Sequence, residues 1–393
     1  MLNEKMLGLG ENRSVIREIF EFGNKRRAEV GAENVYDFSL GNPSIPAPKE
    51  VNETMIKLLS ELDPVKLHGY TSAQGAPDVR KAIAESIIKR FGINANADLI
   101  YMTCGAAASL TICLNAICNQ GDEVVALAPF FPEYRVFVEK AGAKLVVSKC
   151  RESDFQIDFP ALEKVITKNT KAIIVNSPNN PTGVVLSKET IIELASLLNK
   201  KQQEFGKNIF IICDEPYREL AYDVEVPYIP NFYNNTLVCY SYSKSLSLPG
   251  ERIGYIFVSP NVDNKNKVYA AVCGAGRALG FVCAPSMLQL VVRDCIDLTG
   301  DVDAYKKNRD LLYNALKEYG YTAAKPDGAF YLFIKSPIAD ANVFCENAKK
   351  YDLLLVPSDS FGYEGYVRIS YCVSTEQIEK SLPYFKKLIE EYI

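Results

Sequence analysis

Short apolar runs that alternate with amphipathic stretches constrain the fold of this chain more than any other feature of its sequence. Each run is four to six residues long, which suits a buried strand better than a helix. The stretches between several of them, such as 160–166 and 190–199, have the spacing of surface helices. This order predicts an α/β fold in which a mainly parallel sheet lies between helices. The predicted strands are 124–127, 144–147, 172–175, 209–213, 237–240 and 253–258.

The pattern changes near residue 286. A long helical pattern at 288–319 is followed by a glycine-containing strand region at 327–334 and by a terminal helix at 375–392. These elements indicate a smaller α+β domain. We therefore expect three parts, which are an N-terminal segment packed against the small domain (1–47), a large domain (48–286) and a small C-terminal domain (287–393).

Charge and composition exclude several classes of protein. A net charge of −4 provides no basic surface for nucleic acid, and no segment approaches the ~20 apolar residues of a membrane helix. Residues 1–15 mix charged with apolar side chains and so lack the pattern of a signal peptide. The eleven cysteines form no C-x-x-C pair, so we expect a reducing cytoplasm and no metal site. The single histidine, His68, argues against histidine-dependent catalysis.

The most specific segment is SYSKSLSLPGERIGY at 241–255, directly after a predicted strand. A lysine at a strand end can attack an aldehyde when its amine loses its proton near neutral pH, and Lys244 is placed to do so. Ser241 and Ser243 offer hydroxyls on either side of it, and Arg252 offers a planar fork for phosphate oxygens. The structural alternative is a solvated lysine in a serine-rich loop. The whole segment resembles the lysine-attachment signature of class I/II pyridoxal-phosphate-dependent aminotransferases, of fold type I.

Two segments resemble the parts of this family that hold the cofactor's phosphate and ring. TCGAAASL at 103–110 opens a helical pattern, and the small residues Gly105, Ala106 and Ala107 would let backbone N–H groups approach a phosphate. APFFPEY at 128–134 places Phe131 at the position where the family stacks an aromatic ring on the pyridine. Plain packing explains each of these segments equally well when it is taken alone.

Two further segments follow predicted strands, at the end of the sheet where α/β proteins bind ligands. NSPNNPTG at 176–183 resembles the family's Asn-Pro-x-Gly turn, which implies that Asn180 binds the phenolic oxygen of the cofactor. DEPYRELAY at 214–222 resembles the D-x-x-Y pattern. The resemblance implies that Asp214 pairs with the protonated pyridine nitrogen and that Tyr217 binds the phenolic oxygen. A rigid turn and a helix cap are the structural alternatives.

Four residues are assigned to the substrate or to a neighbouring subunit. In GYVRISYC, Arg368 matches the family's arginine that clamps the substrate α-carboxylate. SLGNPS resembles the family's early glycine loop, which implies that the backbone of Gly41 lines the substrate pocket. In GYTSAQG, Tyr70 matches a tyrosine that reaches the phosphate of the neighbouring subunit. Arg277 lies in the region where dicarboxylate-specific members carry an arginine that crosses the dimer interface to bind the distal carboxylate of the substrate. A structural role, or a contact to the other subunit's phosphate, is the alternative.

The resemblance spans about residues 39–371. It implies a large domain with a seven-stranded, mainly parallel sheet, a small domain from both termini, and a homodimer with shared active sites. It also implies pyridoxal 5'-phosphate as cofactor and amino-group exchange between an L-amino acid, such as aspartate or glutamate, and a 2-oxo acid, with Lys244 moving the proton. A pyridoxal-phosphate lyase or decarboxylase on the same fold is the alternative. A binding protein without turnover is disfavoured, because Lys244, Asp214 and Arg368 are all present.

Overall fold

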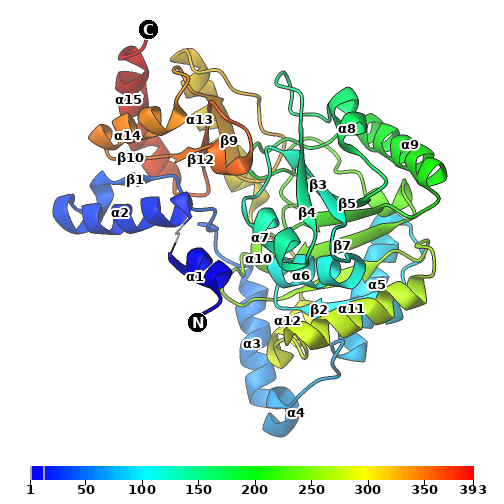
Figure 1. Cartoon of the computed structure of the whole chain (residues 1–393). Coiled ribbons are helices and arrows are strands. Elements are labelled where there is room, and N and C mark those ends of the chain that lie inside the picture. Colours follow the sequence, from blue (N-terminus) through cyan, green and yellow to red (C-terminus); the bar gives the residue numbers. More distant parts are fainter. Residues whose placement is uncertain (1, 12–13) are drawn as a thin grey trace.

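The computed structural model describes residues 2–11 and 14–393, which form a large α/β domain and a smaller domain beside it (Figure 1). The large domain is built on one seven-stranded sheet in the order β2-β8-β7-β6-β5-β3-β4. Strand β8 runs antiparallel to both of its neighbours and the other pairings are parallel. The strands are β2 (Ile100–Thr103), β3 (Glu123–Ala128), β4 (Lys144–Lys149), β5 (Thr170–Asn176), β6 (Phe210–Glu215), β7 (Thr236–Ser241) and β8 (Gly254–Val258).

Six of these strands coincide with the predicted apolar runs, and the mainly parallel sheet between helices is confirmed. The seventh, β2, lies at the edge of the sheet, has the sequence IYMT and was not among the predicted strands. Almost every residue of the inner strands is buried, as expected for a sheet that is covered on both faces.

Helices cover both faces of the sheet. Crossovers between parallel strands are right-handed, so the direction in which the chain steps along the sheet decides which face the connecting helix covers. The step from β3 to β4 and the step from β5 to β6 run in opposite directions along the sheet, so right-handed crossovers place α7 and α9 on opposite faces. Helix α6 packs on β6, β7 and β8 and contacts α7 and α11, so these three helices share a face. The helices of the large domain are α3 (Lys49–Glu61), α4 (Pro64–His68), α5 (Pro77–Phe91), α6 (Ala106–Ile117), α7 (Glu133–Lys140), α8 (Phe159–Val165), α9 (Lys188–Phe205), α10 (Tyr242–Ser245), α11 (Lys265–Leu279) and α12 (Ser286–Asp294).

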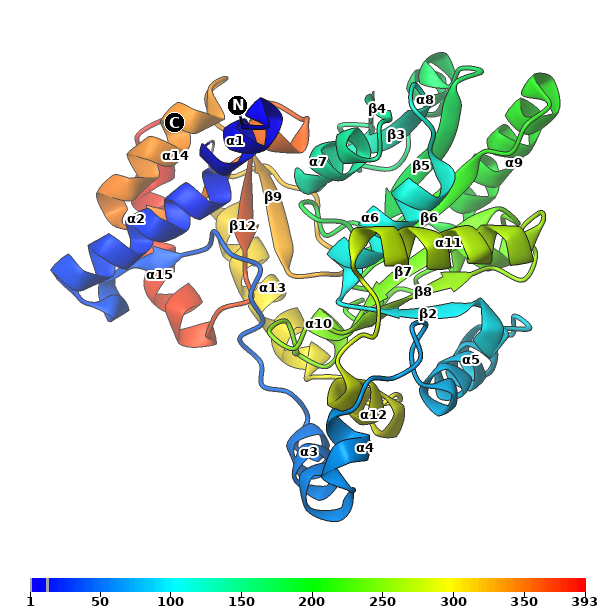
Figure 2. The same ribbon diagram turned by 60° about the horizontal axis from the view of Figure 1, so that its bottom comes forward.

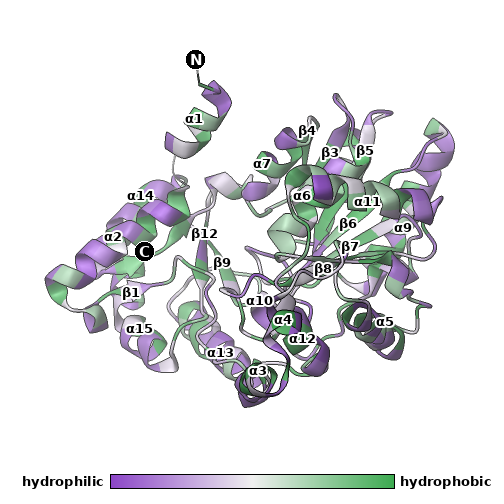
Figure 3. Cartoon of the chain, turned by 90° about the horizontal axis from the view of Figure 1, so that it is seen from below, coloured by the Kyte–Doolittle hydropathy of each residue, from purple (hydrophilic) through white to green (hydrophobic). Residues whose placement is uncertain are grey.

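The small domain joins the two ends of the chain. Strand β1 (Tyr36–Asp37) pairs in parallel with β10 (Leu353–Leu354), and an antiparallel sheet in the order β11-β12-β9 stands beside them. Helices α13, α14 and α15 bury apolar side chains in the core of this domain, whereas α1 has no buried residue and stands apart from the other helices in Figure 3. The other elements are α1 (Glu4–Glu11), α2 (Val15–Val30), α13 (Val302–Glu318), β9 (Tyr331–Lys335), α14 (Ala341–Ala348), β11 (Val356–Pro357), β12 (Tyr366–Ser370) and α15 (Thr375–Glu390); 3₁₀ turns cover Ala32–Asn34, Ala97–Leu99, Ile229–Asn231, Lys349–Tyr351 and Asp359–Phe361.

The long helical pattern predicted at 288–319 is wrong as one element. The chain forms two helices, α12 and α13, and α13 begins afresh where Asp301 caps the N–H of Ala304. The N–H of Gly300 instead bonds the carbonyl of Ser245 at 2.7 Å, so the chain turns here to reach α10. The apolar pattern continues because both helices are amphipathic, although they face different cores.

The domain limits of 1–47, 48–286 and 287–393 remain a proposal, which the packing refines at one point. Leu288, Val291 and Val292 of α12 belong to the core of the large domain, whereas the core of the small domain begins in α13 at Tyr305. We therefore place the boundary between α12 and α13. No helix in the described part of the chain is long and apolar enough to span a membrane.

Candidate active site

A cavity of about 320 Å³ lies where the carboxyl ends of β5, β6 and β7 face the small domain. In Figure 2, β9 and β12 stand opposite the large sheet, with α10 between them. The cavity brings together side chains that are as much as 352 residues apart in sequence. Its walls are Ile16, Leu40, Gly41, Ala106, Ala107, Leu110, Phe131, Asn176, Asn180, Asp214, Pro216, Tyr217, Ser241, Ser243, Lys244, Pro249, Arg252, Tyr331 and Arg368.

Lys244 enters this cavity from α10, a single turn that is capped by Ser241 at the end of β7. Its amine donates a hydrogen bond of 2.6 Å to the carbonyl of Gly41 and stands over the ring of Phe330. Burial lowers the pKa of Lys244 to about 8, and the positive charges of Arg252 and Arg368 act in the same direction. A neutral amine, which is the nucleophilic form, is therefore accessible near neutral pH.

Asp214 is a buried carboxylate at the end of β6 with one oxygen free. Tyr134 donates to Oδ2 at 2.5 Å, whereas Oδ1 is buried and has no hydrogen-bond partner among the described residues. Burial raises the pKa of Asp214 to about 7. A buried oxygen without a partner costs free energy, so this atom is suited to a donor from a bound group.

Arg368 and Asn180 meet on one wall of the cavity. The guanidinium of Arg368 is buried and donates to the amide oxygen of Asn180 at 3.2 Å and to the carbonyl of Ser39. Its Nε has no partner among the described residues, and burial lowers its pKa. A buried arginine with a free donor is suited to a carboxylate. Asn176 holds the loop of Asn180, because its amide oxygen accepts from the backbone N–H of Asn180 at 2.7 Å.

The start of α6 and Arg252 form an anion-binding corner. Gly105 precedes α6 with a φ of +90°, so the first N–H groups of the helix point into the cavity beside Ala106 and Ala107. A Cβ on Gly105 would lie 2.8 Å from Nη2 of Arg252, so the guanidinium would have to move, and the positive φ would strain any other residue. Nη1 of Arg252 also lies 3.4 Å from the hydroxyl of Ser243. Helix N–H groups, a hydroxyl and a guanidinium together suit a phosphate.

Sequence reasoning missed three residues of this site. Tyr134 and Asn176 contact Asp214, and Tyr331 forms a hydroxyl pair with Tyr217 at 2.9 Å. Tyr134 and Asn176 lie inside segments that were singled out for a neighbour. Asn176 ends β5, which was a usable signal, whereas Tyr134 lies in the first turn of α7. Tyr331 had no such signal, because its partner is 114 residues away in sequence.

Comparison with known proteins decides the family. A family model described as aminotransferase class I and II matches residues 32–384. The chain belongs to this family. It is 33% identical to a probable aspartate aminotransferase of Methanocaldococcus jannaschii, with 96% of this chain and 97% of that one covered. An aminotransferase structure from Eubacterium rectale is 57% identical with a TM-score of 0.98 and covers 100% of this chain and 99% of its own. An aspartate aminotransferase of Thermus thermophilus with maleate is 26% identical with a TM-score of 0.86, at 99% coverage of both.

The protein is therefore an aminotransferase, an enzyme that transfers nitrogenous groups, and its mainly parallel large sheet with a smaller domain is that family's fold. The relatives are not uniform in specificity. A protein of Thermococcus litoralis that is 28% identical, with 97% of this chain and 96% of its own covered, is named an aromatic-amino-acid aminotransferase.

Two residues predicted for this aminotransferase lie outside the cavity of the single chain. Tyr70 follows α4 and is 98% exposed, and Arg277 is exposed in the last turn of α11. Both had been assigned to contacts across a subunit interface, so their roles remain predictions. His68 is exposed at the end of α4, away from the cavity walls. No group of three or more metal-ligating side chains occurs among the described residues.

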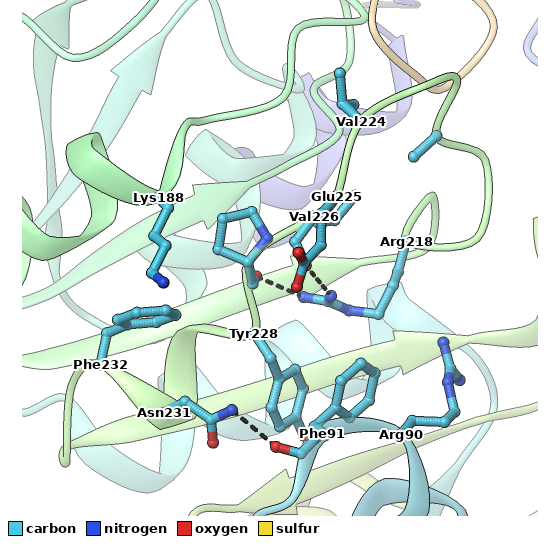
Figure 4. A pocket seen from close by; sticks show the side chains of 12 residues that line it. Arg90, Phe91, Lys188, Arg218, Val224, Glu225, Val226, Tyr228, Asn231 and Phe232 are labelled. Atoms are coloured by element: carbon cyan, nitrogen blue, oxygen red, sulfur yellow. Dashed lines mark hydrogen bonds between the residues drawn. The ribbon is translucent and has the colours of Figure 1, made fainter.

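A second hollow, of about 420 Å³, is lined by Arg218 and other residues that follow Tyr217 in the chain, together with Arg90 and Phe91 (Figure 4). Its buried cation, Arg218, is already engaged. Arg218 makes two hydrogen bonds of 2.6 Å to Glu215 and donates to the carbonyls of Val226 and Pro227. Arg218 therefore holds the chain next to Asp214 in place and has no free charge to offer a ligand in this hollow.

Proposed function

We propose that this aminotransferase uses pyridoxal 5'-phosphate, held in the cavity of Lys244. The observation that carries the proposal is the pairing, in one cavity, of a buried lysine whose pKa is lowered with a buried aspartate whose Oδ1 has no partner. The free Oδ1 suits the protonated pyridine nitrogen, and the corner made by α6, Ser243 and Arg252 suits the phosphate. Ser241 caps α10 behind this corner.

The remaining groups of the cavity suit the ring and its phenolic oxygen. Phe131, on the wall after β3, presents an aromatic ring for stacking. Asn180 and Tyr217 offer an amide and a hydroxyl for the phenolic oxygen. When bound, the cofactor withdraws electrons from the α-carbon of an amino acid attached to it.

The protein's own contribution is to place acids, bases and charges. Lys244 is the base that takes the α-proton and the acid that returns it, which its lowered pKa favours near neutral pH. Asp214 keeps a positive charge on the pyridine nitrogen. Arg368 clamps the α-carboxylate through its free Nε, and the backbone of Gly41 closes the same side.

The substrates that we propose are an L-amino acid, with aspartate or glutamate as candidate donors, and a 2-oxo acid. Support comes from relatives named aspartate aminotransferases and from the Thermus structure with maleate, a dicarboxylate. Of the described residues that line the cavity, Lys244, Arg252 and Arg368 are the cations. A distal carboxylate would therefore need a cation from elsewhere, for which Arg277 of a partner subunit is our candidate.

We further propose a homodimer and a cytoplasmic location. Tyr70 and Arg277 are exposed in the single chain, which supports roles at a subunit interface. Apolar side chains on α3 and around α4, including Ile56, Leu59 and Val65, are more than half exposed, as a further contact surface would require. All eleven cysteines are free, which supports a reducing compartment.

A half-reaction screen tests the proposed function. The purified protein is loaded with pyridoxal phosphate and mixed with single amino acids, and absorbance follows conversion of the cofactor to its pyridoxamine form. We expect conversion with at least one amino acid and reversal on addition of a 2-oxo acid. Release of ammonia with retention of the pyridoxal form would indicate a lyase instead, and loss of carbon dioxide would indicate a decarboxylase.

A further inference from the structure

Tyr331 lines the cavity but takes no part in the chemistry proposed for Lys244, Asp214 and Arg368. It is the first residue of β9, is 2% exposed and lines the cavity between Gly41 and Tyr217. Its hydroxyl lies 2.9 Å from the hydroxyl of Tyr217, which is its hydrogen-bond partner among the described residues. The two rings meet edge to face, at 5.7 Å and 82°. A buried pair of hydroxyls therefore stands beside the place proposed for the cofactor's phenolic oxygen.

The ring of Tyr331 is fixed independently of its hydroxyl. The guanidinium of Arg368 lies over the ring at 4.8 Å from its centre. On another side the backbone of Gly41 comes so close that a Cβ there would lie 1.9 Å from the hydroxyl oxygen. A phenylalanine at position 331 would keep the packing on Arg368 and Tyr217 and would remove the hydroxyl alone.

A hydroxyl has one proton, so each tyrosine of the pair can donate to only one acceptor. If Tyr217 donates to the phenolic oxygen, its own oxygen is free to accept the proton of Tyr331. Burial raises the pKa of Tyr331 to about 12, so its hydroxyl keeps its proton at neutral pH. Two such bonds in series strengthen each other in a dry site.

We propose that Tyr331 is a positioning residue that donates to Tyr217 and thereby fixes Tyr217 as the donor to the phenolic oxygen of the cofactor. This inference rests on the proposed function. It has a spectroscopic consequence, because the phenolic oxygen competes with the nitrogen joining Lys244 to the cofactor for a proton. A stronger hydrogen bond to the phenolic oxygen makes that oxygen a weaker acceptor for the shared proton. The proton is then lost at a lower pH, so the midpoint of the visible-band titration falls.

The test is a pH titration of the visible absorption band of the loaded protein. Tyr331→Phe is compared with wild type, with Tyr217→Phe and with the double variant. Tyr321→Phe is the matched control, because its buried hydroxyl donates to the backbone of Phe385 at 2.8 Å in the small domain, away from the cavity walls. Thermal unfolding of the cofactor-free variants reports structural effects separately.

We expect Tyr331→Phe to raise the titration midpoint by roughly 0.5 pH unit, the size of one neutral hydrogen bond. Tyr217→Phe should raise it further, Tyr321→Phe should leave it unchanged, and the double variant should match Tyr217→Phe. An unchanged midpoint in Tyr331→Phe overturns the inference, as does a shift that persists in the Tyr217→Phe background. A wild type that gains no visible band with pyridoxal phosphate overturns the proposed function and this inference together.

Discussion

Lys244 and Gly41 meet through a hydrogen bond of 2.6 Å that joins the two domains across the cavity. The amine thus has a neutral partner and no carboxylate, which leaves burial to set its pKa at about 8. We expect Lys244→Ala to abolish transamination and to change the free energy of unfolding by no more than about 1 kcal/mol. Borohydride reduction of the loaded wild type followed by peptide mapping should label Lys244. A label on another lysine would contradict the assignment.

Asp214 makes stability depend on pH in the cofactor-free protein. Its folded pKa of about 7 lies above that of an exposed aspartate, so the folded state favours the protonated form. The stabilisation from that form is complete below about pH 4 and is lost as the pH rises towards 7. Asp214→Asn should therefore be more stable than wild type at pH 8, by on the order of 2 kcal/mol.

Denaturant unfolding of both cofactor-free proteins between pH 4 and 8 measures this difference. The gap should shrink as the pH falls, and a gap that is constant with pH would contradict the buried, neutral carboxyl. With cofactor bound, the same variant should lose turnover by ~100-fold or more, because the pyridine nitrogen loses its counter-charge.

Residues such as Lys244, Asp214 and Arg368 could be predicted because each sits in a dense local motif. Their partners could not. Tyr134 reaches Asp214 across 80 residues of sequence, and Tyr331 reaches Tyr217 across 114. Such contacts depend on how strands are ordered in the sheet and how the domains face each other, which no local pattern encodes.

At the scale of elements, short continuous apolar runs identified the central strands, because the middle of an inner strand is buried on both faces of the sheet. The break between α12 and α13 was missed although Gly300 and Asp301 mark it. An aspartate that follows a glycine is a signal for a helix start, although α12 already ends at Asp294, and the continuing amphipathic pattern obscured the break. The edge strand β2 was also missed, although it is as long as several of the runs that were predicted.

The start of α6 supplies a prediction at this scale. Gly105→Ala would force an alanine into a φ of +90° and place its Cβ 2.8 Å from Arg252. We expect the Kd for pyridoxal phosphate to rise by about tenfold or more, because the new Cβ would push Arg252 away from the proposed phosphate site. Equilibrium dialysis or absorbance titration of the cofactor-free protein measures this Kd.

Gly92→Ala is the matched control. Gly92 ends α5 with a φ of +69°, and a Cβ there would meet nothing within 4 Å. Both variants should lose about 1 kcal/mol or more of stability from backbone strain. Only Gly105→Ala should lose affinity. Equal affinities in the two variants would remove the start of α6 from the phosphate site.

At the scale of the whole molecule, the site is completed by two domains, and we propose that it is completed further by a second chain. The exposed positions of Tyr70 and Arg277 carry this expectation, together with the absence of a fourth cation among the described residues of the cavity wall. Two hypotheses for Arg277 follow. It either binds the distal carboxylate of an acidic substrate in the partner's site, or it serves the cofactor phosphate or the structure.

Substrate comparison separates these hypotheses. If Arg277 binds a distal carboxylate, Arg277→Ala removes a charge-assisted pair and should lower kcat/KM for aspartate and glutamate by about 100-fold, equivalent to ~3 kcal/mol. Alanine and tyrosine have no distal carboxylate, so their kcat/KM should change less than about threefold. The measurement is kcat/KM for all four amino acids in wild type and variant at one protein concentration, with the oligomeric state of both checked by light scattering. An equal fall for all four amino acids would assign Arg277 to the cofactor or the structure, because only those roles act on every substrate alike.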